Sequence, residues 1–270
     1  MIGINAVPDN TVRDRFWIWG HPAHSHDAEW NLPGTSRMTA AEGALYLDVP
    51  NMLMVTYNGE PKPPYDQLAI ALRPLKRIVW SIVGAGSLTE AAERDAAIEL
   101  ATRFPNITGM MMDDFFNETD ADGKPGTLSV SQLSEIREKL VLADRSLDLW
   151  TVLYRHQLEM SVQEHLDMCE VLTCWTWWAK DLVDLEATFE RFEAVSPNTR
   201  KVLGCYLWDY GDKQQVPIEL MQHQCELGLR WLREGRIEGM IFLASCVCDL
   251  ELPAVEWTRR WIAEVGDEVL

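Results

Sequence analysis

The sequence predicts an α/β protein that forms a single-domain (β/α)8 TIM barrel over residues 1–270. Short apolar runs rich in Val, Ile, Trp and Tyr alternate with longer segments of helical periodicity, and there are eight of each. No linker or internal repeat divides the chain, and 270 residues is an ordinary length for one barrel. The rival fold, a doubly wound open sheet, usually has fewer strands and a glycine-rich phosphate turn, which the sequence lacks.

The eight units follow one another in a regular order along the chain. The predicted strands are residues 16–20, 52–57, 77–83, 108–113, 147–154, 171–177, 201–208 and 239–245. The predicted helices lie within residues 39–47, 65–74, 87–104, 129–143, 161–168, 181–195, 217–236 and 252–266. The first helix opens on a capping box, Thr39 with Glu42. The longest irregular segments, 21–38, 58–64 and 115–128, each follow a strand, which places them on the catalytic face of a barrel.

Composition and charge narrow the range of partners and locations. The formal net charge is −18, so the chain should repel nucleic acid and anionic membranes. No apolar run reaches the roughly 18 residues of a membrane helix, and residues 1–16 lack the layout of a signal peptide. Six scattered cysteines without a disulfide framework agree with a cytoplasmic location. No cofactor is expected, and the sequence does not indicate an oligomeric state.

Aromatic and imidazole side chains gather at the predicted strand ends, where barrels carry their functional residues. Aromatic faces stack on the C–H faces of sugars, and neighbouring polar groups bind sugar hydroxyls. The alternative for each tryptophan is simple core filling. We therefore expect a small carbohydrate as the ligand, with these candidate binding residues: Trp19, His21, His26, Tyr57, Trp80, Tyr154, His156, Trp175, Trp177, Tyr206, Trp208 and Asp249.

Carboxylates at the strand ends are candidates for acid/base chemistry. Asp113 and Asp114 stand between "MMM" and "FF", and Asp209 stands between two aromatic residues. Glycoside hydrolysis needs two carboxyl groups, and a like-charged neighbour raises the pKa of one of them. Strand alternation should turn Asp113 toward the barrel axis. These three are the predicted catalytic residues; the alternative is that Asp113 caps the following loop and Asp114 is solvated.

An Asp-Asp pair at the end of the fourth strand of a sugar-binding TIM barrel resembles the substrate-assisted hexosaminidases of the O-GlcNAcase type. The resemblance implies that Asp113 orients the 2-acetamido group of the substrate and that Asp114 is the general acid. It also implies an aromatic pocket, with Tyr154 or Tyr206 at the acetamido oxygen and Trp177 or Trp208 as the wall. It covers this short motif and the predicted barrel, and the first loop, "GHPAHSHDAEW", is not part of that pattern.

Two further functions stay open. His24-Ser-His26 imitates the H-x-H of metal-dependent amidohydrolase barrels, and His156 with Asp249 would complete a zinc site. The sixth strand offers Trp and Cys where those enzymes have His. A non-catalytic carbohydrate-binding barrel would keep the aromatic residues without needing the acids. The turn "GAGS" at 84–87 can either hold an anion or cap the next helix.

Overall fold

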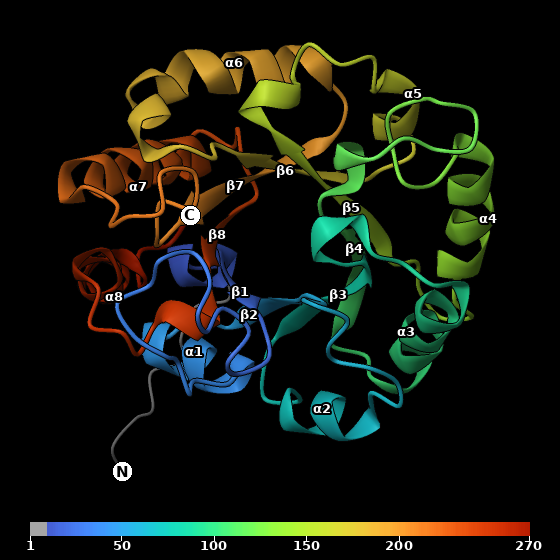
Figure 1. The fold of residues 1–270 in the computed structure, drawn as a ribbon, viewed down its shortest axis with the longest axis horizontal. Coiled ribbons are helices and arrows are strands. Elements are labelled where there is room, and N and C mark those ends of the chain that lie inside the picture. The colour runs from blue at the N-terminus through green and yellow to red at the C-terminus, as the bar shows by residue number, and fades with distance from the viewer. Residues whose placement is uncertain (1–9) are drawn as a thin grey trace.

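The protein forms a closed barrel of eight parallel strands surrounded by helices (Figure 1). The structure is a computed structural model that describes residues 10–270. Each strand pairs with the next in chain order, and β8 pairs with β1 to close the ring. The predicted (β/α)8 barrel is confirmed. The prediction about a signal peptide concerns residues 1–16, most of which lie outside the described range.

All eight predicted strand–helix units are present. The strands are β1 (Phe16–Gly20), β2 (Asn51–Met54), β3 (Arg77–Val83), β4 (Ile107–Met112), β5 (Asp148–Tyr154), β6 (Val171–Trp175), β7 (Arg200–Tyr206) and β8 (Gly239–Leu243). The helices are α1 (Ala40–Leu47), α2 (Asp66–Ala71), α3 (Ala91–Arg103), α4 (Val130–Leu140), α5 (Gln163–Leu166), α6 (Leu185–Val195), α7 (Ile218–Arg233) and α8 (Pro253–Val265). The capping box of α1 forms as predicted, because Thr39 Oγ1 accepts from Glu42 N and Glu42 Oε2 accepts from Thr39 N.

Several strands end earlier than their apolar pattern predicts. β2 stops at Met54, because Tyr57 pairs with Glu60 across a tight turn. β7 stops at Tyr206, and Asp209 then pairs with Gln214 in the same way. The apolar character continues past these strand ends because the loops above the barrel are themselves packed. Sequence periodicity alone does not separate a strand from a buried loop that continues it.

Tryptophans paired with glycines fill the inside of the barrel. Trp175 on β6 lies against Gly204 on β7, where an added Cβ would sit 2.2 Å from Trp175 Cδ2. Trp150 lies against Gly109 in the same manner, at 2.9 Å from Nε1. Trp175 also meets Trp19, with ring centroids 5.2 Å apart. Barrel interiors are packed rather than hollow, so a cavity can form only above this aromatic layer.

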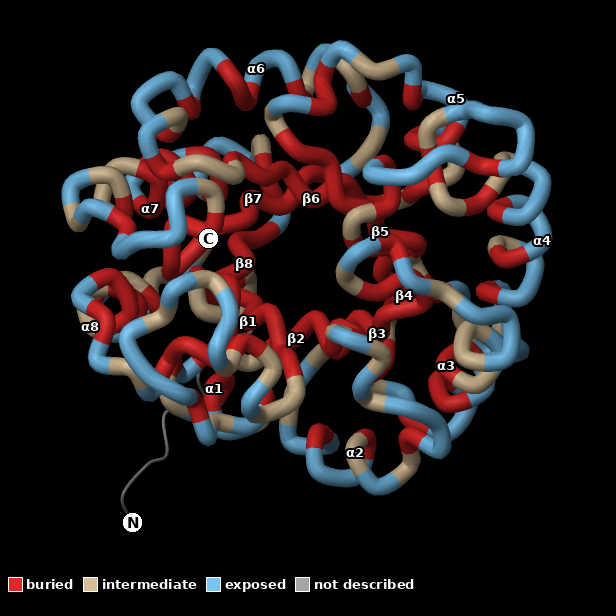
Figure 2. The backbone as a smooth tube through the Cα atoms, viewed as in Figure 1, coloured by how far each residue is buried: buried red, intermediate tan, exposed pale blue. Residues whose placement is uncertain are grey.

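Burial follows the layers of the fold (Figure 2). The strands are buried, while the outward faces of the helices are exposed. All six cysteines are buried and free, as expected for a chain without a disulfide framework. Within residues 10–270, none of the helices has the length and apolar character needed to cross a membrane.

Replacing Gly204 by alanine should lower the free energy of unfolding by about 1–3 kcal/mol, because the new methyl group overlaps the Trp175 ring. Urea unfolding followed by tryptophan fluorescence measures the change. Gly34→Ala is the matched control: its added Cβ would lie 3.6 Å from Leu250 Cδ2, so the expected change is within about 0.5 kcal/mol. Equal unfolding midpoints for the two variants would contradict the packing described here.

Candidate functional site

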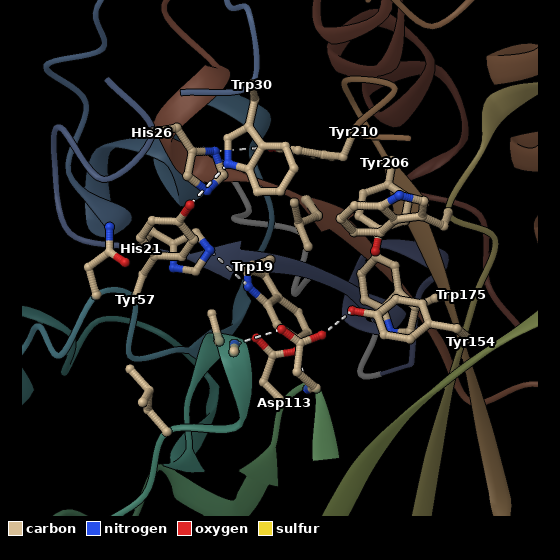
Figure 3. A pocket seen from close by; sticks show the side chains of 17 residues that line it. Trp19, His21, His26, Trp30, Tyr57, Asp113, Tyr154, Trp175, Tyr206 and Tyr210 are labelled. Atoms are coloured by element: carbon tan, nitrogen blue, oxygen red, sulfur yellow. Dashed lines mark hydrogen bonds between the residues drawn. The ribbon is translucent and has the colours of Figure 1, made fainter. Parts of the chain in front are cut away.

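A cavity of about 390 Å³ opens at the carboxyl end of the barrel (Figure 3). Residues at the ends of all eight strands, or in the loops that follow them, contribute to its wall. The lining consists of Trp19, His21, His26, Trp30, Tyr57, Asn58, Ala85, Gly86, Leu88, Asp113, Asp114, Tyr154, Trp175, Trp177, Tyr206, Tyr210 and Leu243. Two carboxyl groups therefore face a cavity that is otherwise mostly aromatic.

Ten of the fifteen predicted site residues line this cavity. They are Asp113, Asp114, Trp19, His21, His26, Tyr57, Tyr154, Trp175, Trp177 and Tyr206. The convergence arises because parallel strands bring their carboxyl ends to one face of the barrel. Strand alternation explains why Trp19 and His21, or Trp175 and Trp177, share the inward direction.

Asp114 is held by donors from two neighbouring strand ends. It follows β4 in the left-handed region, with φ of 50°, which turns its side chain out of the strand alternation. Its Oδ1 accepts a hydrogen bond from Tyr154 Oη at 2.7 Å, and its Oδ2 accepts one from Gly86 N at 2.7 Å. The "GAGS" turn thus donates a backbone N–H to a carboxyl group of the protein itself.

Asp113 lies beside Asp114 in a very different environment. Only 5% of it is exposed, and its Oδ1 accepts from Asp114 N at 2.9 Å. Within residues 10–270 its second carboxyl oxygen has no hydrogen-bond partner. Burial raises the pKa of Asp113 well above 3.8, and the charge of Asp114 raises it further. The two carboxyl groups of the pair therefore differ: burial favours the protonated form of Asp113, whereas Asp114 is held by two hydrogen-bond donors.

His21 supports the cavity floor and does not act as a free base. Tryptophan can only donate, so the 3.2 Å contact from Trp19 Nε1 requires an unprotonated Nε2 on His21. The proton then sits on Nδ1, which donates to Val55 O at 3.4 Å. Burial lowers the pKa of His21 well below 6.5, in agreement with this neutral form. His21 thus fixes the orientation of the Trp19 ring through this hydrogen bond.

The loop after β1 covers one side of the cavity. Trp30 Nε1 donates to Tyr57 Oη at 3.0 Å, and Trp208 Nε1 donates to Trp30 O at 3.0 Å. His26 lies inside this cluster, 3.2 Å from Tyr210 Oη through its Nδ1. Burial lowers the pKa of His26 to about 4, so it is neutral at neutral pH. The histidine-rich loop therefore supplies an aromatic wall.

Five predicted site residues lie outside the cavity. Trp80 packs against Tyr65, with ring centroids 5.2 Å apart, because strand alternation turns it outward. Trp208 is buried and anchors the loop through the carbonyl of Trp30. His156 stacks on Tyr154 at 5.3 Å and lines a neighbouring pocket.

The two remaining aspartates hold loops. Asp209 Oδ1 accepts from Asp212 N at 3.2 Å, within the tight turn after β7. Asp249 accepts from Ser36 Oγ at 2.6 Å and from Arg37 N at 2.8 Å, which ties the first loop to the last one. Asp209 accepts from a donor of its own loop and Asp249 accepts from donors of the first loop, and neither side chain lines the cavity with Asp113 and Asp114.

The ligand set of the metal alternative does not come together. His24 is exposed and pairs with Asp27 at 2.8 Å, while His26 faces the aromatic cluster. His156 and Asp249 belong to other parts of the face, as described above. From residue 10 onward, the structure contains no group of three or more His, Cys, Asp or Glu side chains able to hold a metal ion. These residues therefore do not fit the proposed zinc site.

Trp30, Tyr210 and Gly86 line the cavity although sequence reasoning did not select them. Trp30 and Gly86 have φ of 57° and 67°, so local turns in the loops place them. For Trp30, the available signal was a large aromatic residue in an otherwise polar segment. For Gly86, it was a glycine turn directly after a strand.

Comparison with known proteins shows likeness at the level of the fold. No protein-family model matches the chain, and no curated protein matches its sequence. A thermostable chitinase domain from Pyrococcus furiosus, crystallised with chito-oligosaccharides, is 13% identical with a TM-score of 0.55, over 87% of this chain and 85% of that one. A GH18 chitinase from Cycas revoluta, in complex with (GlcNAc)4, is 14% identical with a TM-score of 0.53, over 91% and 98%. YKL-39, crystallised with chitooligosaccharides, is 10% identical with a TM-score of 0.58, over 92% and 98%. The barrel is thus of the kind found in glycoside hydrolases and chitinase-like proteins.

The raised pKa of Asp113 predicts a pH dependence of stability. Above pH 3.8 the native protein retains a proton that the unfolded chain releases, so stability falls as pH rises, by up to about 1.4 kcal/mol per pH unit, until native Asp113 also ionises. In the Asp113→Asn variant this fall in the free energy of unfolding should be absent, because the amide does not ionise. The variant should unfold at a higher urea concentration than wild type at pH 7–8, with the advantage shrinking toward pH 4.

Unfolding midpoints measured from pH 4 to pH 8 test this expectation. Asp95→Asn is the control, because Asp95 is an exposed residue of α3 that pairs with Lys139 at 2.6 Å, away from the cavity. A difference between wild type and Asp113→Asn that stays constant over the whole range would contradict the assignment of the proton to Asp113.

Proposed function

We propose that this protein hydrolyses the glycosidic bond of an N-acetylated amino sugar, and that the acetamido group of the substrate takes part in the reaction. The observation that carries the proposal is the pair of carboxyl groups at the end of β4. Asp113 is buried with a raised pKa, whereas Asp114 accepts hydrogen bonds from Tyr154 and Gly86. One group can donate a proton to the leaving oxygen, and the other can stabilise a positive charge that develops on the substrate.

The walls of the cavity support a sugar ligand. On the β6–β7 side, the ring of Tyr206 lies 4.9 Å from the ring of Trp175 and 5.7 Å from the ring of Trp177, measured between centroids. Such a surface stacks on the C–H faces of a pyranose. The Pyrococcus furiosus chitinase domain and YKL-39 were crystallised with chito-oligosaccharides, which agrees with an amino sugar here.

The position of the carboxyl groups supports participation of the substrate. Most glycosidases place two carboxyl groups about 5–9.5 Å apart on opposite sides of the scissile bond. In this cavity the two carboxyl groups are sequence neighbours at one strand end, and the described lining contains no other Asp or Glu. The nucleophile on the other side of the scissile bond must therefore come from the substrate. The carbonyl oxygen of a 2-acetamido group, which lies next to the anomeric carbon, is a suitable nucleophile.

The environments of the two aspartates favour particular roles. The resemblance noted above assigns the acid to Asp114, but Asp114 already accepts from two donors. Asp113 carries the proton in the free protein, so we assign proton donation to Asp113. Asp114 then stabilises the acetamido N–H as that group becomes positively charged. Tyr154 remains protonated, because burial raises its pKa well above 10, and it keeps Asp114 in position.

Leaving-group dependence tests these roles. For wild type we expect hydrolysis of nitrophenyl N-acetylglucosaminide but not of the matching glucoside, which lacks the acetamido group. Asp113→Asn should lose about 10²-fold or more on substrates with a poor leaving group, and much less on a dinitrophenyl glycoside, which needs no proton. Asp114→Asn should lose activity on both. The measurement is kcat/KM for each substrate, with Asp95→Asn as the control.

Three results would contradict parts of this proposal. Equal activity on the glucoside would remove the role of the acetamido group. If the loss of activity depends on the leaving group in Asp114→Asn and not in Asp113→Asn, then Asp114 is the general acid, as the resemblance implies. Binding of N-acetylglucosamine oligomers, seen by tryptophan fluorescence, without any hydrolysis would favour the second candidate, a carbohydrate-binding barrel. That candidate is favoured by the lining, in which aromatic side chains far outnumber the two carboxyl groups.

A further inference from the structure

A second pocket adjoins the main cavity on the β5–β6 side. Its volume is about 260 Å³, below the roughly 300–1,000 Å³ of sites for drug-sized ligands, which suits one sugar unit. Its lining is polar and charged where the main cavity is aromatic. The residues are Arg155, His156, Glu159, Trp177, Trp178, Asp181 and Arg191.

Trp177 lies between the main cavity and the second pocket. It lines both of them, and it is only partly buried. On one side its ring meets Tyr154 and Tyr206 of the main cavity, with centroids 5.9 and 5.7 Å apart. A ligand that leaves the main cavity across Trp177 therefore enters the second pocket directly.

His156 links the second pocket to the paired carboxyl groups. Its ring stacks on Tyr154, with centroids 5.3 Å apart and planes 9° apart, and Tyr154 donates to Asp114. Burial lowers the pKa of His156, and the charge of Asp114 opposes that shift, so the imidazole lies within electrostatic reach of the carboxylate. The second pocket is thus next to the reacting groups and not a distant surface feature.

The charges of the second pocket alternate in sign. Arg155 pairs with Asp181 at 2.6 Å and lies 3.7 Å from Asp184, and Arg191 pairs with Glu159. A guanidinium has five N–H donors, so each arginine retains donors beyond those in its ion pair. An anionic ligand would meet two carboxylates in the lining, Glu159 and Asp181, each already paired with an arginine. A neutral sugar, whose hydroxyl groups both donate and accept, matches this alternation.

We infer that the second pocket is a subsite for a further neutral sugar unit, and that the substrate is an oligosaccharide extending across Trp177. This inference rests on the proposed function, in that the ligand of the main cavity is taken to be a sugar. Arg155, Arg191 and His156 would bind the hydroxyls of the additional unit, while Trp177 contacts the units on either side.

The test compares ligands of different length. Chito-oligosaccharides of one to four units are titrated against wild type, Arg191→Gln and His156→Ala, with binding followed by tryptophan fluorescence and calorimetry. For wild type, affinity should rise when the ligand becomes long enough to enter the second pocket. In both variants the affinity for the longer oligomers should fall about tenfold more than the affinity for the monosaccharide, since hydrogen bonds from the guanidinium or the imidazole to sugar hydroxyls are lost.

Arg230→Gln is the matched control. Arg230 pairs with Glu186 on the outside of the barrel, and 45% of its side chain is exposed, against 47% for Arg191. It should keep the wild-type ratio of affinities. Thermal unfolding of each variant tests whether the fold is intact. Because two different residues are replaced, a local structural defect at one of them cannot by itself produce the expected result.

The outcomes separate this inference from the proposed hydrolysis. If wild type hydrolyses nothing but shows length-dependent binding that Arg191→Gln and His156→Ala reduce, the subsite stands and the hydrolase proposal fails. If oligomers are hydrolysed but affinity does not increase with length, or both variants weaken all lengths equally, the subsite is overturned. Tighter binding of an acidic oligosaccharide than of the neutral one of equal length would also overturn it.

Discussion

The site depends on how the protein solvates two carboxyl groups that adjoin each other at the end of β4. Two ionised carboxylates so close together, one of them buried, would repel strongly. The fold provides Tyr154 Oη and Gly86 N–H for Asp114 and leaves one oxygen of Asp113 without a donor among residues 10–270. A proton on Asp113 removes the repulsion. The "GAGS" turn, the left-handed backbone at Asp114 and the burial of Tyr154 all serve this division.

The aromatic residues of the barrel have two separate tasks. Below the cavity, tryptophans pack against Gly109, Gly204 and Gly239 and close the interior, where a larger residue would overlap their rings. Above that layer, Trp30, Trp177 and Tyr210 surround an open space. The same residue type thus provides a rigid floor and a surface for stacking. Because the floor is packed, the two carboxyl groups are held at a fixed depth in the cavity.

The loops above the barrel are held in place by hydrogen bonds to one another. Asp249, after β8, accepts from Ser36 and Arg37 of the first loop, and Trp208, after β7, donates to Trp30 O of that same loop. These contacts connect residues 178 to 213 positions apart along the chain. They keep Trp30 beside Tyr57 and leave the β5–β6 side of the face accessible, where the polar pocket around Arg155 and Arg191 adjoins the cavity.

The sequence by itself determined the barrel, because eight alternations of strand and helix periods appear directly in the order of apolar residues. It also determined that Asp113, Asp114 and most of the strand-end aromatics would share one space, since parallel strands end on one face. Only the tertiary structure decided the positions beyond the strand ends, where alternation no longer applies. Trp80 faces away, and Asp209 and Asp249 turn to loop donors. The donors of Asp114 lie 28 and 40 residues away, a pairing that no local pattern contains.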